Sequence, residues 1–339
     1  MKRACQLLPC SAAVVLALLA PALWAQQINS SPNVVGSGAR ALGMGGAFIA
    51  VADDATAASW NPGGLTQLER PEISVVYTFK WLGEDFTSLT HPELDSTNDV
   101  AFDQLNYLSV VYPIPRTIGG RNLVLSLNYQ RKYDFDRNID FDLGLLGPVG
   151  GGLGQVWHHA KYSQRGSLGS FSPAFGFELT DRLSVGAVMN IWDEKFVPDN
   201  EWTTTNTRLR WDEKFENFEG INYTFGVLYK PTERLSLGAV YHTKFTADVD
   251  YTSIMRVMPL GGLPVIMRSE RPMEYTFPSA VGVGVAYRFP NDKLTLSMDI
   301  TRREWDQFVI HDPYNPSFLG KKRSGITNLP VDWSPHDPT

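Results

Sequence analysis

The chain has 339 residues and a formal net charge of -6, which leaves room for two soluble domains or for one large β structure. A generally acidic protein attracts phosphate backbones poorly, so the charge argues against a nucleic-acid partner. After the N-terminal region, no stretch supplies the roughly 18 consecutive apolar residues of a membrane-spanning helix. If this protein enters a membrane, it does so as strands.

The N-terminus has the layout of a secretory signal peptide. Lys2 and Arg3 precede an apolar run at 12–20, and polar glutamines follow Ala25. The run is too short to span a bilayer as a helix, which favours a cleaved signal over an uncleaved anchor. We therefore expect export of the chain and removal of residues 1–25. Both cysteines lie inside this segment, so the mature chain is expected to carry no disulfide.

The next segment, residues 26–70, is glycine-rich and alanine-rich. Its central part, "GARALGMGGAFIAVADDATAASWNPGGL" at 38–65, is nearly free of charge. Asp54 is suited to cap a short helix over 55–60, which the Asn-Pro pair that follows would end. Such a compact segment need not pair as a strand, and it can fold into a lumen and plug it.

Two other interpretations of this segment are weaker. Gly36, Gly38 and Ala41 fit a dinucleotide-binding spacing, but no strand precedes them and no βαβ unit surrounds them. Asp53 and Asp54 could be metal ligands or an acid/base couple. The capping role of Asp54 explains the pair without such chemistry, so we expect no metal, no catalytic residue and no cofactor here.

From residue 71 onward the dominant period is two. In "RLSLGAVYHTK" the residues Leu235, Leu237 and Tyr241 fall on one face, while Ser236 and Gly238 fall on the other. One face is apolar and the other is mostly polar or small, and the same alternation recurs in most of the segments that follow. The pattern predicts antiparallel strands with one apolar side.

The turns between these strands alternate in length. Tight turns are expected near 180, 231 and 290, whereas the long connections are 82–102, 134–165, 195–218 and 250–272. A soluble sandwich has no reason to keep every second connection long, but a transmembrane barrel has short turns at one end and long loops at the other. Aromatic residues near the strand ends fit interfacial girdles: Phe79, Trp81, Tyr129, Tyr229, Tyr241, Tyr287 and Phe289.

These features predict an all-β fold, a transmembrane antiparallel β-barrel over 71–339 with the apolar side chains outside. Small residues would then face the lumen and leave room in it: Gly186, Gly226, Gly238, Gly282, Gly284 and Ala286. About nine strands precede residue 306, and a closed single-chain bacterial barrel normally has an even number. We therefore expect the barrel in this chain, with about 9–10 strands, to be incomplete and truncated at its C-terminus.

Two blocks of the sequence carry a resemblance to a known family. Residues 38–65, with a glycine-rich run, an "ADDA" segment and Asn61-Pro62, resemble the N-terminal hatch of the FadL/TodX family of outer-membrane transporters for hydrophobic compounds. Residues 277–308, "FPSAVGVGVAYRFPNDKLTLSMDITRREWDQF", resemble a late hairpin of that family. Gly63 departs from the family, which usually has alanine there.

The resemblance implies a 14-stranded barrel whose lumen is blocked by the hatch, in the outer membrane. It implies ligands such as long-chain fatty acids or aromatic hydrocarbons, caught on an apolar outer loop and passed to a site that touches the hatch. Carried over by position, the hatch motif is Gly43, Gly45, Gly46, Asn61 and Pro62, with Phe48 beside the ligand. The strand count falls about five short of the family's.

Two long connections carry apolar residues that would form a binding surface at the outer side. The first contains Leu145, Leu146, Leu153 and Trp157, and the second contains Met255 and Met258, whose side chains adapt to varied apolar ligands. The alternative is that these loops only pack on each other and cover the barrel.

A fatty-acid carboxylate would need a cation or a donor in the lumen. Four cationic residues face inward on the expected register, Lys80, Lys244, Arg288 and Arg303. Each of them could instead pair with a lumen acid such as Asp299, and a slip of one residue would turn all of them outward.

The leading hypothesis is passive uptake of hydrophobic small molecules across the outer membrane, in contact with its lipid. The alternative is a scaffold like the PorV-like proteins of type IX secretion, which hold or shuttle secreted partner proteins and share the hatch signature. An enzyme is not expected: no GxSxG motif accompanies His158 and His159. The sequence gives no oligomeric state.

Overall fold

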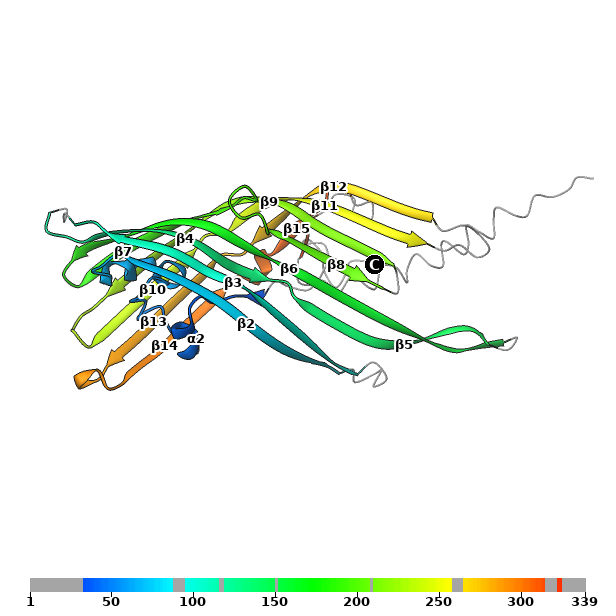
Figure 1. Ribbon diagram of the computed structural model, residues 1–339, viewed down its shortest axis with the longest axis horizontal. Coiled ribbons are helices and arrows are strands. Elements are labelled where there is room, and N and C mark those ends of the chain that lie inside the picture. The colour runs from blue at the N-terminus through cyan, green and yellow to red at the C-terminus, as the bar shows by residue number, and fades with distance from the viewer. Residues whose placement is uncertain are drawn as a thin grey trace, which may run out of the picture.

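A computed structural model of the chain describes residues 33–87, 95–115, 119–149, 152–207, 210–257, 265–314 and 322–324. Its strands form one 16-stranded sheet in which the paired strands are antiparallel (Figure 1). The signal peptide expected over 1–25 lies outside the described residues. Within the described residues, no helix is both long enough and apolar enough to cross a membrane.

Within the described residues, the sheet consists of nine long passes of the chain, several of which are interrupted. The first two are β2 (Glu72–Phe86) and β3 (Ser96–Pro113). The next four are β4 (Leu123–Asp134) continued by β5 (Arg137–Val149), then β6 (Gly152–Thr180), then β7 (Leu183–Trp192) continued by β8 (Glu201–Asn206), then β9 (Trp211–Tyr229).

The last three passes are interrupted as well. They are β10 (Leu235–His242) with β11 (Phe245–Val257), β12 (Val265–Phe277) with β13 (Ala280–Arg288), and β14 (Thr295–Arg303) with β15 (Val309–His311). Each pair keeps the same neighbouring pass across its break. Two-residue strands, β1 (Asn33–Val34) and β16 (Arg323–Ser324), pair with β4 and β15. The nine passes agree with the count made from the sequence.

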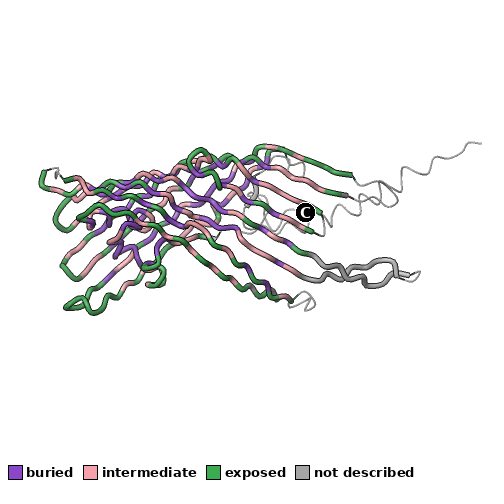
Figure 2. The backbone as a smooth tube through the Cα atoms, viewed as in Figure 1, coloured by how far each residue is buried: buried purple, intermediate pink, exposed green. Residues whose placement is uncertain are grey.

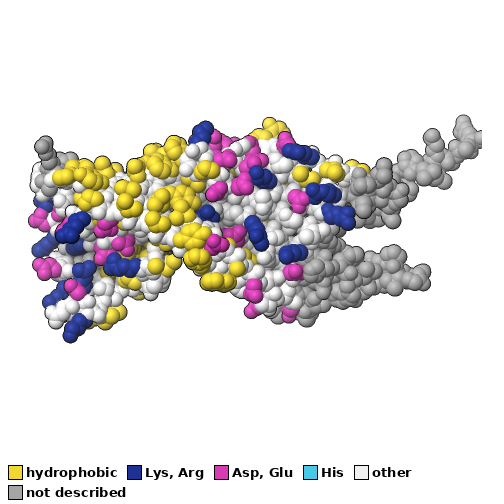
Figure 3. Space-filling view, viewed as in Figure 1, with side chains coloured by type: hydrophobic (Ala, Val, Ile, Leu, Met, Phe, Trp, Pro, Cys, Tyr) yellow, Lys and Arg dark blue, Asp and Glu magenta, His cyan; other side chains and the backbone are white. Residues whose placement is uncertain are grey.

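The outer surface of the sheet confirms the predicted orientation of the apolar side chains. Trp81 is 79 % exposed and Ile73 is 75 % exposed, and the apolar residues of β4, β9, β13 and β14 continue this belt. Buried and exposed positions alternate along the strands (Figure 2). On the visible face the apolar side chains gather in one zone, with charged side chains on both sides of it (Figure 3). We call this zone the apolar belt.

The long connections expected at one end are in large part strands, which corrects the sequence analysis. β5, the first half of β6, β8, β11 and β12 occupy most of them and extend the sheet beyond the apolar belt. The expectation failed because the apolar side changes there from the outside to the inside. In β11, Phe245, Val249 and Tyr251 are buried, so a search for apolar-out strands misses them.

The two ends of the sheet differ in their connections. Tight turns join β6 to β7 and β9 to β10, and the short 3-10 helix η3 (Pro290–Asp292) joins β13 to β14. We call this the short-turn end and the opposite end, with the extended hairpins, the far end (Figure 1). Among the described residues, β2 pairs only with β3 and β14 only with β13, so these two strands are edges of the sheet.

Candidate functional site

Residues 34–68, the N-terminal segment, lie against the concave inner face of the sheet. The segment contains three short helices: α2 (Ala39–Gly43), α3 (Ala57–Trp60) and the 3-10 helix η1 (Pro62–Gln67). As expected, the Asn61-Pro62 pair ends the helix over residues 57–60, because proline cannot continue the hydrogen-bond pattern. Asn61 also begins η1, since its side chain accepts a hydrogen bond from the Gly63 amide at 3.0 Å.

Asn61 fixes the segment to the wall. Its side chain is fully buried. The Nδ2 atom donates to the carbonyl oxygen of Ile49 at 2.8 Å and to that of Val227 in β9 at 2.9 Å. The one amide therefore joins two parts of the N-terminal segment to a wall strand, which gives a physical role to the Asn-Pro motif.

Glycines of the wall strands make room for the N-terminal segment. An alanine at Gly226 would place its Cβ 2.5 Å from Pro62 Cδ, and one at Gly176 would place it 2.8 Å from Leu65 Cβ. Alanine at Gly186 or Gly238 would clash with backbone of the same segment. The prediction that Gly186, Gly226 and Gly238 face the lumen is confirmed, and Gly176 joins them. They are glycine because the backbone of the N-terminal segment packs directly on them.

A second set of contacts joins the segment to β14. Asp299 accepts a hydrogen bond from the Ile49 amide at 2.7 Å, and the Ser297 hydroxyl donates to the Ala47 carbonyl at 2.8 Å. On the opposite wall, the hydroxyls of Tyr107 and Ser109 donate to the Ala55 carbonyl at 3.0 and 3.1 Å. The segment is thus held by side chains of several strands.

Asp53 and Asp54 have structural roles. Asp54 accepts hydrogen bonds from the amide and the hydroxyl of Thr56, at 2.8 and 2.6 Å, just before α3. Asp53 forms an ion pair with Arg40 of α2 and lies 3.7 Å from the Arg288 guanidinium. Within the described residues, no group of three or more His, Cys, Asp or Glu side chains is placed to hold a metal ion.

A cavity of about 400 Å³ lies between the N-terminal segment and the wall, on the side that faces the far end. This volume falls within the range of roughly 300–1,000 Å³ that is typical of small-molecule sites. Apolar and aromatic side chains contribute most of its lining: Val34, Val35, Ile49, Trp60, Tyr133, Trp192, Val240, Phe245, Pro278 and Trp305.

The ionisable side chains that line this cavity are all basic. Lys132, His242 and Arg303 line it, and no Asp or Glu is among its described lining residues. Arg303 reaches the Tyr133 hydroxyl at 3.5 Å and lies over the Trp305 ring, and His242 bonds the Thr224 hydroxyl at 3.0 Å. No described carboxylate forms an ion pair with Lys132 or Arg303. Two cations in a mostly apolar cavity repel each other, and an anion there would offset this cost.

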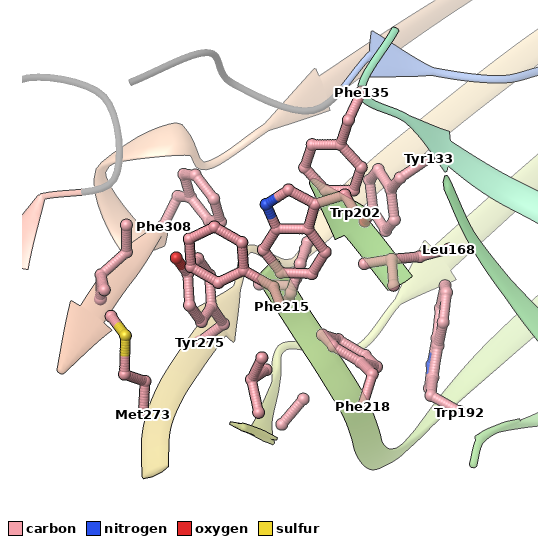
Figure 4. Close-up of a cluster of buried hydrophobic side chains, with 14 of the residues drawn as sticks. Tyr133, Phe135, Leu168, Trp192, Trp202, Phe215, Phe218, Met273, Tyr275 and Phe308 are labelled. Carbon is pink, nitrogen blue, oxygen red and sulfur yellow. The ribbon is translucent and has the colours of Figure 1, made fainter. Parts of the chain in front are cut away.

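An aromatic cluster fills the lumen between the cavity and the far end (Figure 4). Tyr133, Trp192 and Phe245 belong both to the cavity lining and to this cluster. Trp192 stacks on Phe245 at 5.3 Å, and further out Trp202 stacks on Phe135 at 4.6 Å and on Phe215 at 4.5 Å. Aromatic side chains therefore continue from the cavity toward the far end.

The structure brings some of the expected site residues to this cavity. Arg303 and Gly46 line it, and Phe48 packs edge-on against the Trp60 ring, at 6.1 Å, without lining it. Gly45 and Gly46 have positive φ angles of 67° and 79°, and Gly43 ends α2. Positive φ is where glycine is favoured, so this stretch forms a tight turn.

Other expected residues lie elsewhere. Arg288 lies at the short-turn end beside Asp53, away from Arg303. Lys80 points inward as expected but is 3.6 Å from the Asp134 carboxylate. Lys244 is exposed in the break between β10 and β11 and does not line the cavity, so its inward orientation was wrong. The break changes which alternate residues point inward.

The apolar loop residues are only partly described. Met255 is half-buried on β11, opposite Met267 of β12. Met258 lies outside the described residues. Leu145 and Leu146 are on β5, and Leu153 and Trp157 are on β6, in one hairpin at the far end. The side chains of these four residues are outside what the structure describes, so their part in binding stays a prediction.

Most of the cavity lining was not predicted from the sequence. Lys132, Trp192 and His242 were not singled out, although each belongs to the inward set of its strand. The signal that could have found them is a change along the inward-facing residues of the strands. These residues are polar or small near the N-terminal segment and aromatic beyond it, as in β11 and β12.

Neither a family model nor a curated protein sequence matches this chain. Among solved structures, the CymD monoaromatic hydrocarbon channel aligns over 83% of this chain and 72% of its own length, with a TM-score of 0.54 and 16% identity. A Pseudomonas aeruginosa FadL homologue aligns over 89% and 73%, with a TM-score of 0.46 and 14% identity. The Pseudomonas putida toluene transporter TodX aligns over 75% and 68%, with a TM-score of 0.42 and 14% identity. The likeness to CymD shows a shared fold, so the barrel expected from the sequence is confirmed.

Proposed function

We propose that this chain is an outer-membrane transport protein that takes up hydrophobic compounds passively, with the N-terminal segment as the hatch of its lumen. The observation that carries the proposal is the cavity of about 400 Å³, closed on one side by that segment and bounded on the other by the aromatic cluster. The apolar belt around the sheet supports a membrane location. The shared fold with a monoaromatic hydrocarbon channel agrees with this function.

The proposed orientation follows from the two ends of the sheet. Bacterial outer-membrane barrels have short periplasmic turns and longer outer connections. We therefore assign the short-turn end to the periplasm and the far end to the outside. A hydrophobic compound would reach the cavity from the aromatic side and meet the hatch there.

The charges of the cavity favour an amphipathic ligand with an acidic head group over a neutral hydrocarbon. Lys132 and Arg303 lack a described carboxylate partner, and both line a largely apolar space. A carboxylate placed between them would gain charge-assisted hydrogen bonds, while an alkyl chain or a ring would contact Trp192, Phe245 and their neighbours. The proposed substrate class is therefore hydrophobic carboxylic acids.

Uptake of labelled compounds by Gram-negative cells would test the proposal. The cells lack their own long-chain fatty acid transporter and express the full chain, and labelled oleate and labelled toluene are supplied in parallel. We expect oleate uptake above that of cells with the empty vector. A variant that lacks residues 38–65 should change the rate or the selectivity of uptake, because the hatch is gone.

Correct assembly in the outer membrane without uptake of either compound would refute transport. A scaffold for secreted protein partners would then be the better hypothesis. Uptake of toluene alone would keep transport but refute the assignment of a carboxylic acid as substrate.

A further inference from the structure

A second, smaller cavity lies at the short-turn end, beyond the hatch. Its volume is about 50 Å³. One water needs roughly 10–15 Å³ of such space, so a carboxylate group fits but a long alkyl chain does not. Four cationic side chains line it: Arg40 of the hatch, Lys230 and Arg234 at the turn after β9, and Arg288 of β13.

Two of the four cations of this cavity, Arg40 and Arg288, have carboxylate partners. Glu233 is its one acidic lining residue within the described chain. Arg40 pairs with Asp53 and lies 3.8 Å from Asp54, and Arg288 lies 3.7 Å from Asp53 and 3.8 Å from Asp292. Lys230 donates to the Gln67 amide oxygen at 2.6 Å, a neutral partner. An anion that entered here would therefore find donors on Lys230 and Arg234, which form no ion pair with a described carboxylate.

The two cavities lie along the same strands of the wall. In β14, Thr301 and Arg303 line the larger cavity and Thr295 lines the smaller one. Between them, Ser297 and Asp299 hold residues 47–49 of the hatch. Six residues of strand separate Thr295 from Thr301, or about 20 Å. A short stretch of the hatch thus divides two cationic cavities on one wall.

We propose that the smaller cavity is a second binding site, which receives the carboxylate head group of the transported acid on the periplasmic side of the hatch. This inference rests on the proposed function, because it assumes a hydrophobic acid as cargo. Lys132 and Arg303 hold the head group before the hatch, and Lys230, Arg234 and Arg288 hold it after the hatch. Release of the 47–49 contacts from β14 would connect the two sites.

The test uses the full chain folded in a neutral detergent and dodecanoate labelled with ¹³C at the carboxyl carbon. We expect two bound carboxyl signals in the NMR spectrum. The double variant Lys230→Gln/Arg288→Gln should weaken one of them by at least about tenfold in affinity, since each lost charged hydrogen bond is worth about one decade. The variant Lys132→Gln/Arg303→Gln should weaken the other.

Two further variants keep the test decisive. Arg234→Gln leaves every described hatch contact in place and should still weaken the second signal, even if the double variant folds poorly. Lys293→Gln, exposed on the neighbouring turn and outside the lining, should leave both signals unchanged. A single signal, lost on changing Lys132 and unaffected by Arg234→Gln, would overturn the second site and leave the proposed function intact. No bound signal at all would refute both.

Discussion

The substitution Asn61→Asp tests how the hatch is held. The side chain is fully buried, and aspartate has nearly the same size as asparagine, so no cavity is created. The change replaces the Nδ2 donor with an oxygen. The carbonyl oxygens of Ile49 and Val227, which accept from Nδ2 at 2.8 and 2.9 Å, then face an acceptor. The bond from the Gly63 amide can persist, because the oxygen that receives it is kept.

The magnitude follows from the two lost bonds. A buried polar group left without its partner costs about 1–3 kcal/mol. Two such groups together cost roughly 2–6 kcal/mol, before the cost of burying a charge is added. At about 1.4 kcal/mol per decade, the displaced form of the hatch should become at least roughly 30-fold more populated.

Hydrogen exchange measures this population directly. In the wild type, the Ile49 amide donates to Asp299, and the amides of Val51 and Ala52 donate to the Phe48 carbonyl. We expect these three amides to exchange faster in Asn61→Asp by at least about 30-fold, while the amides of β9 that pair with β7 keep their rates. Asn122→Asp, at an exposed turn position, is the matched control and should change neither set. Equal exchange at Ile49 in the variant and the wild type, with the barrel folded, would refute the role given to Asn61.

Three further predictions concern the wall, the cavity and the far end. Gly226→Ala should loosen the hatch by about 1–3 kcal/mol, because its Cβ would lie 2.5 Å from Pro62 Cδ. Gly83→Ala, whose Cβ would have its nearest contact at 3.4 Å, is the control. Equal protease resistance of the hatch in the two variants would contradict the steric argument. Lys132→Met should lower oleate uptake while leaving any toluene uptake unchanged, since only the carboxylate of the acid pairs with the Lys132 ammonium group. An equal loss of uptake for both compounds would show that Lys132 acts through packing. Asp136 lies beyond the apolar belt. Burial, together with the nearby Asp134 carboxylate, raises the pKa of Asp136 from 3.8 to about 6. The folded state therefore binds the proton more tightly than the unfolded state, and stability falls as pH rises from about 4 to 6. Asp136→Asn should raise the melting temperature relative to the wild type at pH 7 and lose this advantage at pH 4, and a difference that does not change with pH would argue against the shift.

Much of the wall could be predicted from local sequence. Period-two alternation gave the outward face of β10, β13 and β14, because each strand covers its own share of the belt and lipid contacts every outward residue alike. Turn residues such as the Pro-Asn-Asp at 290–292 marked the short-turn end. The extended hairpins were not predicted, because strands were sought only where apolar residues alternate on the outward face. In the described part of these hairpins the apolar residues lie on the inward face.

The candidate site was predicted only in part. Asn61 and the lumen glycines were identified, since the resemblance and the small inward residues pointed to them. Lys132, Trp192 and His242 come from three strands, and they meet only across the lumen. No spacing along the chain relates them, and the break that turned Lys244 outward has no clear signature in the sequence.

The sequence by itself determined that this chain forms amphipathic strands, that its apolar face points outward at the belt, and that residues 38–65 differ from the strands. These are properties of neighbouring residues, and local periodicity records them. The tertiary structure decided where the hatch sits, which glycines accept its backbone, and which charges line the cavities on its two sides. Those features depend on register, strand breaks and the curvature of the sheet, which bring together residues as far apart as Ile49 and Asp299.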